Sequence, residues 1–492
     1  MNLRPLKSLP ALLGAGALAI LIYVGTSSKT ASGNEDDTVV SEQVAQEQSA
    51  IHAGPTQSVE TRQVGLDYQH FASLLRQRDD KVIKEMIAEI EADWDTAYIP
   101  FLLETVSYAA AFTTEREIFH LLKRKTGQDI GYDETDWYQW WWNQPAAQTP
   151  DYANFKADLY RLIDPRFGRY FKDRQDSALV RLDEVRWGGV LQDGIPPLRS
   201  PEMLGAEEAE YLGDDDIVFG IEINGDARAY PKRILAWHEM FVDTVGGVDI
   251  AGVYCTLCGT VIPYKTEFEG TNHALGTSGF LYRSNKLMYD AETQSLWNTL
   301  RGEPVIGPLA DKGIQLEHLS VVTTSWSEWK RRHPDTQVLS LETGHRRDYD
   351  EGAAYREYFA TDRLMFNTPF QDTRLKNKQE VLALRFAGAP GQQLAIDTDF
   401  LMANPVYKDR IGLQRFVVLT DSSGANRVYD PADVDFVSYD GDAAVTDADG
   451  QIWQLTESAL THPDGTQRGR LPYHRAFWFG WKATFPETRL VK

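Results

Sequence analysis

Cysteine is almost absent from this sequence, which has only Cys255 and Cys258 among its 492 residues. A second C-x-x-C does not exist, so a zinc site with four cysteine ligands is excluded. All thiol chemistry is therefore confined to one C-x-x-C motif. That motif can be one local disulfide, part of a metal site, or a redox pair.

Three common catalytic motifs are also missing. The chain has no G-x-x-x-x-G-K-[ST], no G-x-S-x-G and no H-E-x-x-H. Nucleotide hydrolysis, α/β-hydrolase chemistry and zincin proteolysis therefore lose their usual support.

Basic residues are in short supply. The chain has 50 Lys and Arg against 72 Asp and Glu, a net charge of −22. Nucleic acids and anionic membrane surfaces repel such a protein, so neither is expected as a partner. A solvated acidic surface that keeps an exported protein soluble explains the charge.

Apolar runs long enough to cross a membrane are missing outside the N-terminus, where Arg4 and Lys7 precede an apolar stretch over residues 9–24. This pattern predicts a signal peptide or a signal anchor over residues 1–26, and the sequence leaves cleavage open. The positive charges before the stretch place the rest of the chain across the membrane. We therefore expect an exported protein, periplasmic or anchored in the membrane and facing the periplasm or exterior, where conditions are oxidising.

The next part of the chain divides into a linker and a helical module. Residues 27–62 are rich in polar residues and predict a flexible linker. Over residues 63–150 apolar residues recur at helical spacing, with a last-turn basic cluster before Gly127. We predict a small all-α, repeat-like accessory module that offers a surface to a protein partner.

Residues 180–492 have a different pattern. Short β-branched segments such as 216–223, 248–254 and 381–386 alternate with turn residues. The sequence therefore predicts an α+β protein, in which a largely antiparallel β domain with inserted helices follows the all-α module.

The C-x-x-C motif lies between two of these predicted strands. An apolar strand precedes Cys255, and a second strand over residues 260–268 contains Pro263, which forbids a regular helix there. The pair is thus predicted at a hairpin tip and not at the helix N-terminus that redox motifs of the thioredoxin type use. Metal ligation, a redox or labile disulfide, and an inert structural pair remain open.

A metal centre would need ligands besides the two thiolates. His238 lies 17 residues upstream of Cys255, and His474 lies in an apolar block. We predict a zinc or copper site made by Cys255, Cys258, His238 and His474, because soft donors favour these metals. Glu239 is predicted to orient His238 or to act as a general base.

Two further groups are candidates for catalysis. Asp290 is predicted as an acid or base and Arg283 as a clamp for an anion, with a capped β-turn as the alternative. His273 and His333 lie in polar contexts and are predicted at the surface.

Four blocks of the chain resemble the exported family called domain of unknown function 3179. The resemblance covers about residues 190–492 and implies one large domain without an assigned activity. The blocks run from Ala229 to Glu239, from Tyr254 to Thr260, from Ser278 to Trp297, and from His474 to Trp481.

Two alternatives to a metal protein therefore remain. One is a non-enzymatic envelope binding or scaffold module with a Cys255–Cys258 disulfide. The other is a thiol oxidoreductase.

Overall fold

The structure is a computed structural model that describes residues 60–61, 65–145, 147–148 and 151–492. The predicted signal segment and nearly all of the predicted linker lie outside the described residues. Within the described part of the chain, no helix is both long and apolar enough to cross a membrane.

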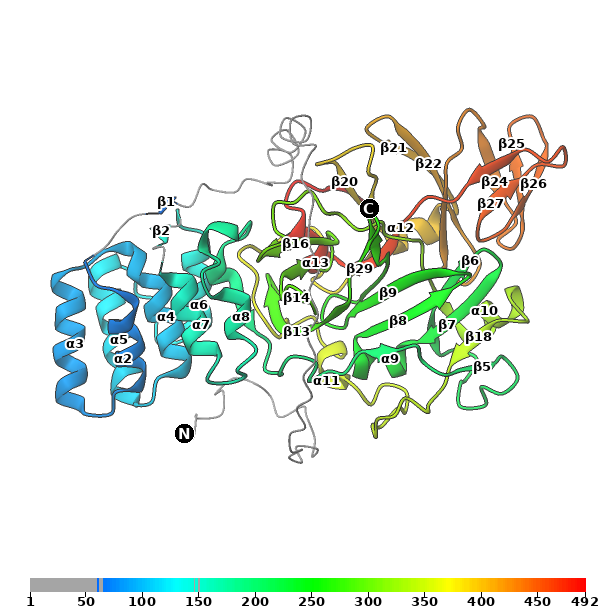
Figure 1. Ribbon diagram of the computed structural model, residues 1–492. Helices are drawn as coiled ribbons and strands as arrows, with labels where there is room; N and C mark the ends of the chain where they lie inside the picture. The colour runs from blue at the N-terminus through cyan, green and yellow to red at the C-terminus, as the bar shows by residue number, and fades with distance from the viewer. Residues whose placement is uncertain (1–59, 62–64, 146, 149–150) are drawn as a thin grey trace, which may run out of the picture.

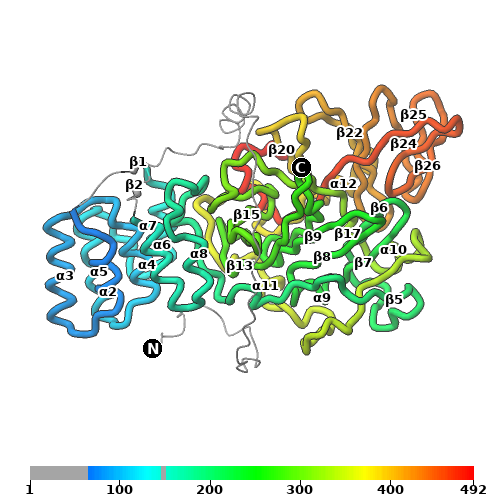
Figure 2. Tube along the Cα trace, viewed as in Figure 1, coloured from blue at the N-terminus to red at the C-terminus, as the bar shows by residue number. Residues whose placement is uncertain are grey.

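Helices dominate the first part of the described chain and run side by side (Figures 1 and 2). Asp67, Asp79 and Asp133 cap three of them, and Gly127 ends α5 in the left-handed conformation, as predicted. The helices are α2 (Tyr68–Arg76), α3 (Asp80–Ala92), α4 (Ile99–Tyr108), α5 (Phe112–Thr126), α6 (Glu134–Trp142), α7 (Tyr152–Tyr160) and α8 (Gly168–Phe171), with 3₁₀ turns at Thr96–Tyr98, Gln175–Ser177 and Leu182–Glu184.

The helices share one apolar core with a five-stranded sheet of the β domain. Phe280 of that sheet packs against Tyr160, Phe167 and Phe171, with ring centroids 4.9, 4.9 and 5.1 Å apart. The sheet has the order β16 (Glu303–Ile306), β15 (Leu296–Asn298), β14 (Asn285–Asp290), β13 (Leu275–Tyr282) and β3 (Val185–Trp187). The helical module is therefore joined to the β domain by buried aromatic packing.

Two other sheets contain the C-x-x-C hairpin and the strands on either side of α9. One has the order β10 (Thr260–Lys265), β9 (Val248–Cys255), β8 (Met240–Val245) and β4 (Leu198–Arg199). The other has the order β17 (Val322–Ser325), β6 (Ile217–Ile223), β7 (Asp226–Pro231), β18 (Gln337–Leu339) and β5 (Met203–Gly205). Helix α9 (Lys232–His238) connects β7 to β8, and α10 (Trp326–Arg332) follows β17.

The last third of the chain adds three more sheets and the C-terminal helix α13 (Trp478–Thr484). The first sheet has the order β29 (His474–Phe477), β19 (Glu380–Arg385), β20 (Gln393–Asp397) and β30 (Arg489–Val491). The second has the order β21 (Val406–Ile411), β22 (Gln414–Thr420) and β23 (Asn426–Tyr429). The third has the order β24 (Phe436–Tyr439), β25 (Ala444–Asp447), β26 (Ile452–Leu455), β27 (Ala459–Thr461) and β28 (Gln467–Gly469). The remaining elements are α11 (Arg356–Phe359), α12 (Thr398–Ala403) and the short strands Glu60–Thr61, Ala147–Gln148, Glu267–Phe268 and Thr271–Asn272.

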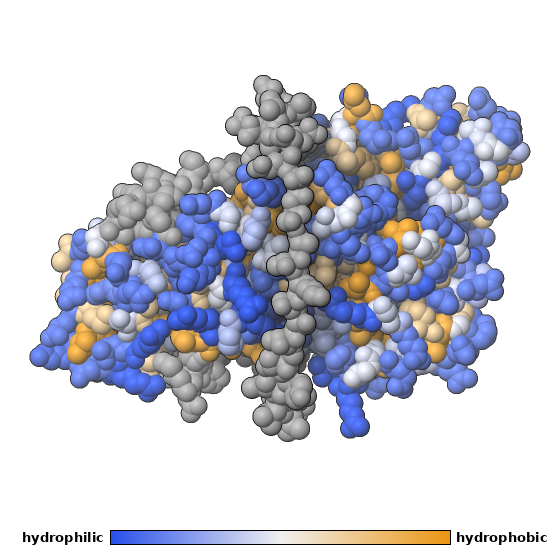
Figure 3. All heavy atoms as spheres, in the orientation of Figure 1, coloured by the Kyte–Doolittle hydropathy of each residue, from blue (hydrophilic) through white to orange (hydrophobic). Residues whose placement is uncertain are grey.

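Most strand pairs are antiparallel, so the α+β prediction is confirmed. The parallel exceptions are β4 with β8, β18 with β7, β20 with β30, and the pair Glu60–Thr61 with Ala147–Gln148. On the face shown in Figure 3 the described residues are mainly hydrophilic, as expected for a chain with this excess of acidic residues.

One ion pair is completely buried in the helical module. Lys156 Nζ lies 2.9 Å from Glu104 Oε2, and neither side chain is exposed. Tyr152 donates to the same carboxylate at 2.6 Å, and Lys156 also donates to the carbonyl of Val185 at 2.9 Å. Both charges are therefore compensated within the protein. Because neither side chain is exposed, water cannot take the place of either partner.

We expect Lys156→Met to lower the free energy of unfolding by about 3–5 kcal/mol, because it leaves the Glu104 carboxylate buried without its counter-charge. Urea denaturation followed by helical circular dichroism measures the change. The matched control is Arg124→Gln, which removes the half-exposed pair with Glu91 (2.6 Å) and should cost less than about 1 kcal/mol. Equal losses in the two variants would contradict this account.

Candidate functional site

The C-x-x-C motif lies at the tip of the β9–β10 hairpin, as predicted. Thr260 pairs with Cys255 in the first register position of the hairpin. Gly259 closes the turn with φ +60°, and a Cβ there would lie 2.7 Å from the Phe477 ring, so only glycine fits. Cys255 and Cys258 are joined as a disulfide with their Cα atoms 5.3 Å apart.

The disulfide is buried under apolar side chains. Cys255 is 2% exposed and Cys258 is fully buried. Leu257, Phe477 and Phe479 belong to the same buried cluster. A molecule that reacts with the disulfide can therefore reach it only if these apolar side chains move aside.

One polar group faces the disulfide from β14. The Oδ1 atom of Asn285 lies 2.8 Å from Cys258 Sγ. The Asn285 amide nitrogen is 3.1 Å from the Arg283 carbonyl, 3.3 Å from the Gly480 carbonyl and 3.2 Å from Thr484 Oγ1, which fixes the oxygen toward the sulfur. In the reduced state this oxygen is positioned to accept a hydrogen bond from the Cys258 thiol.

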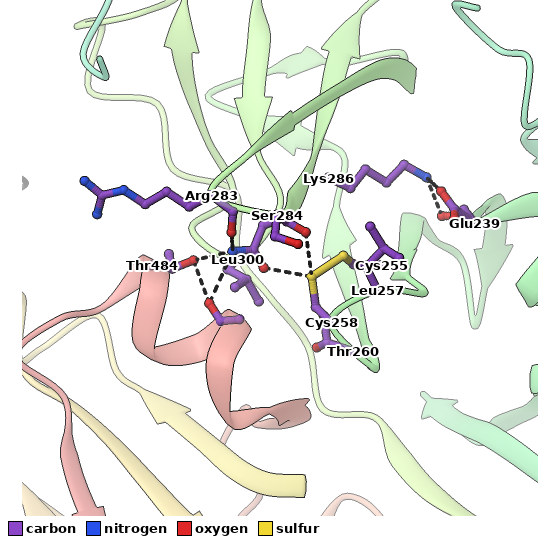
Figure 4. Close-up of a disulfide and its surroundings, with 12 residues drawn as sticks. Glu239, Cys255, Leu257, Cys258, Thr260, Arg283, Ser284, Lys286, Leu300 and Thr484 are labelled. Atoms are coloured by element: carbon purple, nitrogen blue, oxygen red, sulfur yellow. Dashed lines mark hydrogen bonds and ion pairs between the residues drawn. A yellow bond between two sulfur atoms is a disulfide. The ribbon is translucent and has the colours of Figure 1, made fainter. Parts of the chain in front are cut away.

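A buried ion pair lies on the other side of Cys255 (Figure 4). Lys286 Nζ is 3.1 Å from Glu239 Oε2 and 3.1 Å from the Glu239 carbonyl oxygen. Burial lowers the pKa of Lys286, and the Glu239 carboxylate opposes that shift. Glu239 thus contacts Lys286, whereas the sequence predicted that it would orient His238 or act as a general base.

The two predicted imidazole ligands have separate surroundings. His238 Nδ1 is 2.9 Å from the Pro196 carbonyl oxygen, and its Nε2 is 2.6 Å from Tyr349 Oη. His474 Nδ1 is 2.9 Å from Thr260 Oγ1. Burial lowers the pKa of His238 to about 4 and that of His474 to about 3.

The four predicted metal ligands are not assembled into one centre. Among the residues that the structure describes, no group of three or more His, Cys, Asp or Glu side chains could hold a metal ion. Zinc or copper binding by Cys255, Cys258, His238 and His474 stays a prediction, and it would require reduction of the disulfide and rearrangement of the histidines.

The other predicted site residues have structural partners. Asp290 Oδ1 accepts from the backbone of Thr293 at 2.7 Å, which is the capped turn given as the alternative. Arg283 forms an ion pair with Glu184 at 2.5 Å, so its charge already has a partner within the chain. His273 was predicted at the surface, and this is wrong. It is 5% exposed because it packs against Trp297 and lies 3.3 Å from Asp290 Oδ2.

One segment between β18 and β19, residues 340–379, lies over the predicted site. Its only regular element is α11. Tyr349 contacts His238, Tyr355 donates to Glu239 Oε1 at 3.2 Å, and Tyr358 donates to the Leu257 carbonyl at 2.7 Å. We call Tyr349, Tyr355 and Tyr358 the tyrosine cover.

Sequence reasoning missed the tyrosine cover. The one signal in the sequence is the length of the segment 340–379 that carries these tyrosines. About 40 residues without apolar periodicity are uncommon inside a compact domain and often form functional lids. Asn285 and Lys286 were missed because nothing in the sequence brings β14 to the hairpin tip.

The chain belongs to the DUF3179 family of proteins of unknown function, whose family model matches residues 192–488. The resemblance noted from the sequence is thereby confirmed. No curated protein and no solved structure matches the chain.

We expect acid to destabilise the folded protein partly through His474. Its imidazole stays neutral in the folded state down to a pKa of about 3, whereas in the unfolded chain it takes up a proton near pH 6.5. The unfolded state therefore binds more protons below that pH, and the free energy of unfolding falls by about 1.4 kcal/mol per pH unit for this group.

Urea denaturation between about pH 5 and pH 7 measures that slope. At the acid end of this range His474→Gln should reduce the slope by about one proton, even if the variant is less stable at every pH. His120→Gln in the helical module controls for the loss of an imidazole remote from the hairpin. An unchanged slope in His474→Gln would contradict the assignment.

Proposed function

We propose that this protein is an exported thiol–disulfide oxidoreductase whose reactive group is the Cys255–Cys258 pair. The observation that carries the proposal is a disulfide across a four-residue loop at a hairpin tip. By chain entropy such a loop contributes about 2 kcal/mol, less than the roughly 3 kcal/mol of a 15-residue loop. The β9–β10 ladder and the Cys258 N–H to Cys255 carbonyl bond at 3.1 Å already hold the turn. Structural stabilisation alone is therefore a weak explanation for the Cys255–Cys258 disulfide.

The proposed reaction is exchange with the dithiol of a partner. A partner thiolate attacks Cys255 Sγ, the S–S bond breaks, and Cys258 leaves as a thiolate that takes a proton and donates to Asn285 Oδ1. The partner's second thiolate then attacks the mixed disulfide and releases Cys255, which is protonated in turn. Two electrons and two protons pass from the partner dithiol to the pair, and the partner becomes a disulfide.

Access to the pair is proposed to depend on the tyrosine cover. The hydrogen bonds of Tyr349, Tyr355 and Tyr358 are each worth about 0.5–1.5 kcal/mol, so together they favour the closed state without locking it. Opening would expose Cys255, the more accessible of the two cysteines. We also propose, from the sequence alone, that the N-terminal segment directs export or anchoring and that the helical module docks a protein partner.

The reduction potential tests the proposal. We expect a value between about −120 and −270 mV, the range of catalytic disulfides, when the full chain is equilibrated with thiol buffers and alkylated for mass spectrometry. A potential below about −300 mV, typical of structural disulfides, would favour the scaffold alternative. Stoichiometric zinc or copper bound by the reduced protein would instead favour the metal site.

A variant of the cover gives a second prediction. Tyr358→Phe removes the hydrogen bond to Leu257, so we expect dithiothreitol to reduce the disulfide about three- to tenfold faster. The matched control is Tyr132→Phe, a 63% exposed tyrosine in the helical module, which should leave the rate unchanged. Equal rates in all three proteins would show that the cover does not control access.

A further inference from the structure

A large cavity lies in the β domain apart from the disulfide. Its volume is about 840 Å³, within the usual range for small-molecule sites. It is bordered by the segment 315–320, the end of β19 with the loop after it, and residues 485–487. None of the cysteines and none of the tyrosine cover lines it, so it is independent of the proposed redox site.

Most of the basic groups on the cavity wall are neutralised by carboxylates. Arg470 pairs with Glu457 at 2.6 Å, Lys265 pairs with Glu317 at 2.7 Å, and Arg301 lies 3.5 Å from Glu303. These cations are therefore already engaged by the protein.

Arg385 differs from these cations. Its guanidinium donates to Tyr264 Oη at 3.1 Å, and its Nε is buried without a partner. Among the described residues no carboxylate forms an ion pair with it. A half-buried guanidinium that lines a cavity without a counter-charge is suited to bind an oxyanion.

His318 provides a second unsatisfied group on the same wall. It is 7% exposed, and its Nε2 has no hydrogen-bond partner. Burial, with Arg385 and His474 nearby, lowers its pKa well below the usual range. The ring is therefore neutral at physiological pH and adds no charge to the cavity wall.

We propose that this cavity binds a small organic molecule with one acidic oxyanion group, held by the Arg385 guanidinium. Leu316, Phe386 and Phe485 supply apolar surface for the rest of the ligand. The wall carries four basic and five acidic side chains, so it favours a single acidic group over a polyanion.

Calorimetric titration of the full chain tests the site with benzoate, phenyl phosphate and neutral benzamide at fixed ionic strength. We expect at least one of the two anions to bind and benzamide to bind at least tenfold more weakly. The comparison of benzoate with phenyl phosphate identifies which oxyanion the site prefers. No binding of either anion at up to about 10 mM, or equal binding of benzamide, would overturn the proposal.

Variants locate the site within the protein. Arg385→Gln should weaken anion binding at least tenfold, whereas Arg78→Gln on the exposed surface of the helical module should not change it. Arg385→Lys keeps the charge but loses the planar guanidinium fork, so it should bind the anion severalfold more weakly; it is the second variant if the glutamine variant does not fold. Wild-type affinity in a folded Arg385 variant would place the anion elsewhere and overturn the assignment.

Discussion

The contact between the β9–β10 hairpin tip and β29 holds the β domain together around the disulfide. The Phe477 N–H donates to the Cys258 carbonyl at 2.7 Å, and Thr260 lies 2.9 Å from the His474 ring. These residues are more than 200 positions apart in the chain. Because Gly259 packs against the Phe477 ring, the hairpin tip has no room for a side chain at this position. The disulfide, β29 and α13 therefore have to pack together in one arrangement.

Around this junction the polar groups are arranged in two separate sets. On one side, Asn285 contacts the sulfur of Cys258. On the other side, Lys286, the next residue of β14, forms the ion pair with Glu239. Successive residues of a strand point to opposite faces, so one strand supplies both sets. The tyrosine cover then closes the region from outside.

The sequence was informative wherever a local pattern determines structure. β-branched runs and Pro263 predicted the hairpin and its tip, and Gly127 predicted the end of α5. Local patterns do not predict which residues far apart in the sequence meet in the folded protein. The imidazole of His238 turns toward Pro196 and Tyr349, and that of His474 toward Thr260, because tertiary packing decides the direction of each ring.

The place of β29 and α13 in the chain affects how the protein is made. β29 and α13 complete the surroundings of the Cys255–Cys258 pair, although they follow it by more than 200 positions in the chain. During synthesis the two cysteines therefore emerge from the ribosome long before the strand that buries them. Until β29 and α13 follow, nothing buries the two thiols, so they can react with other thiols or disulfides before folding is complete.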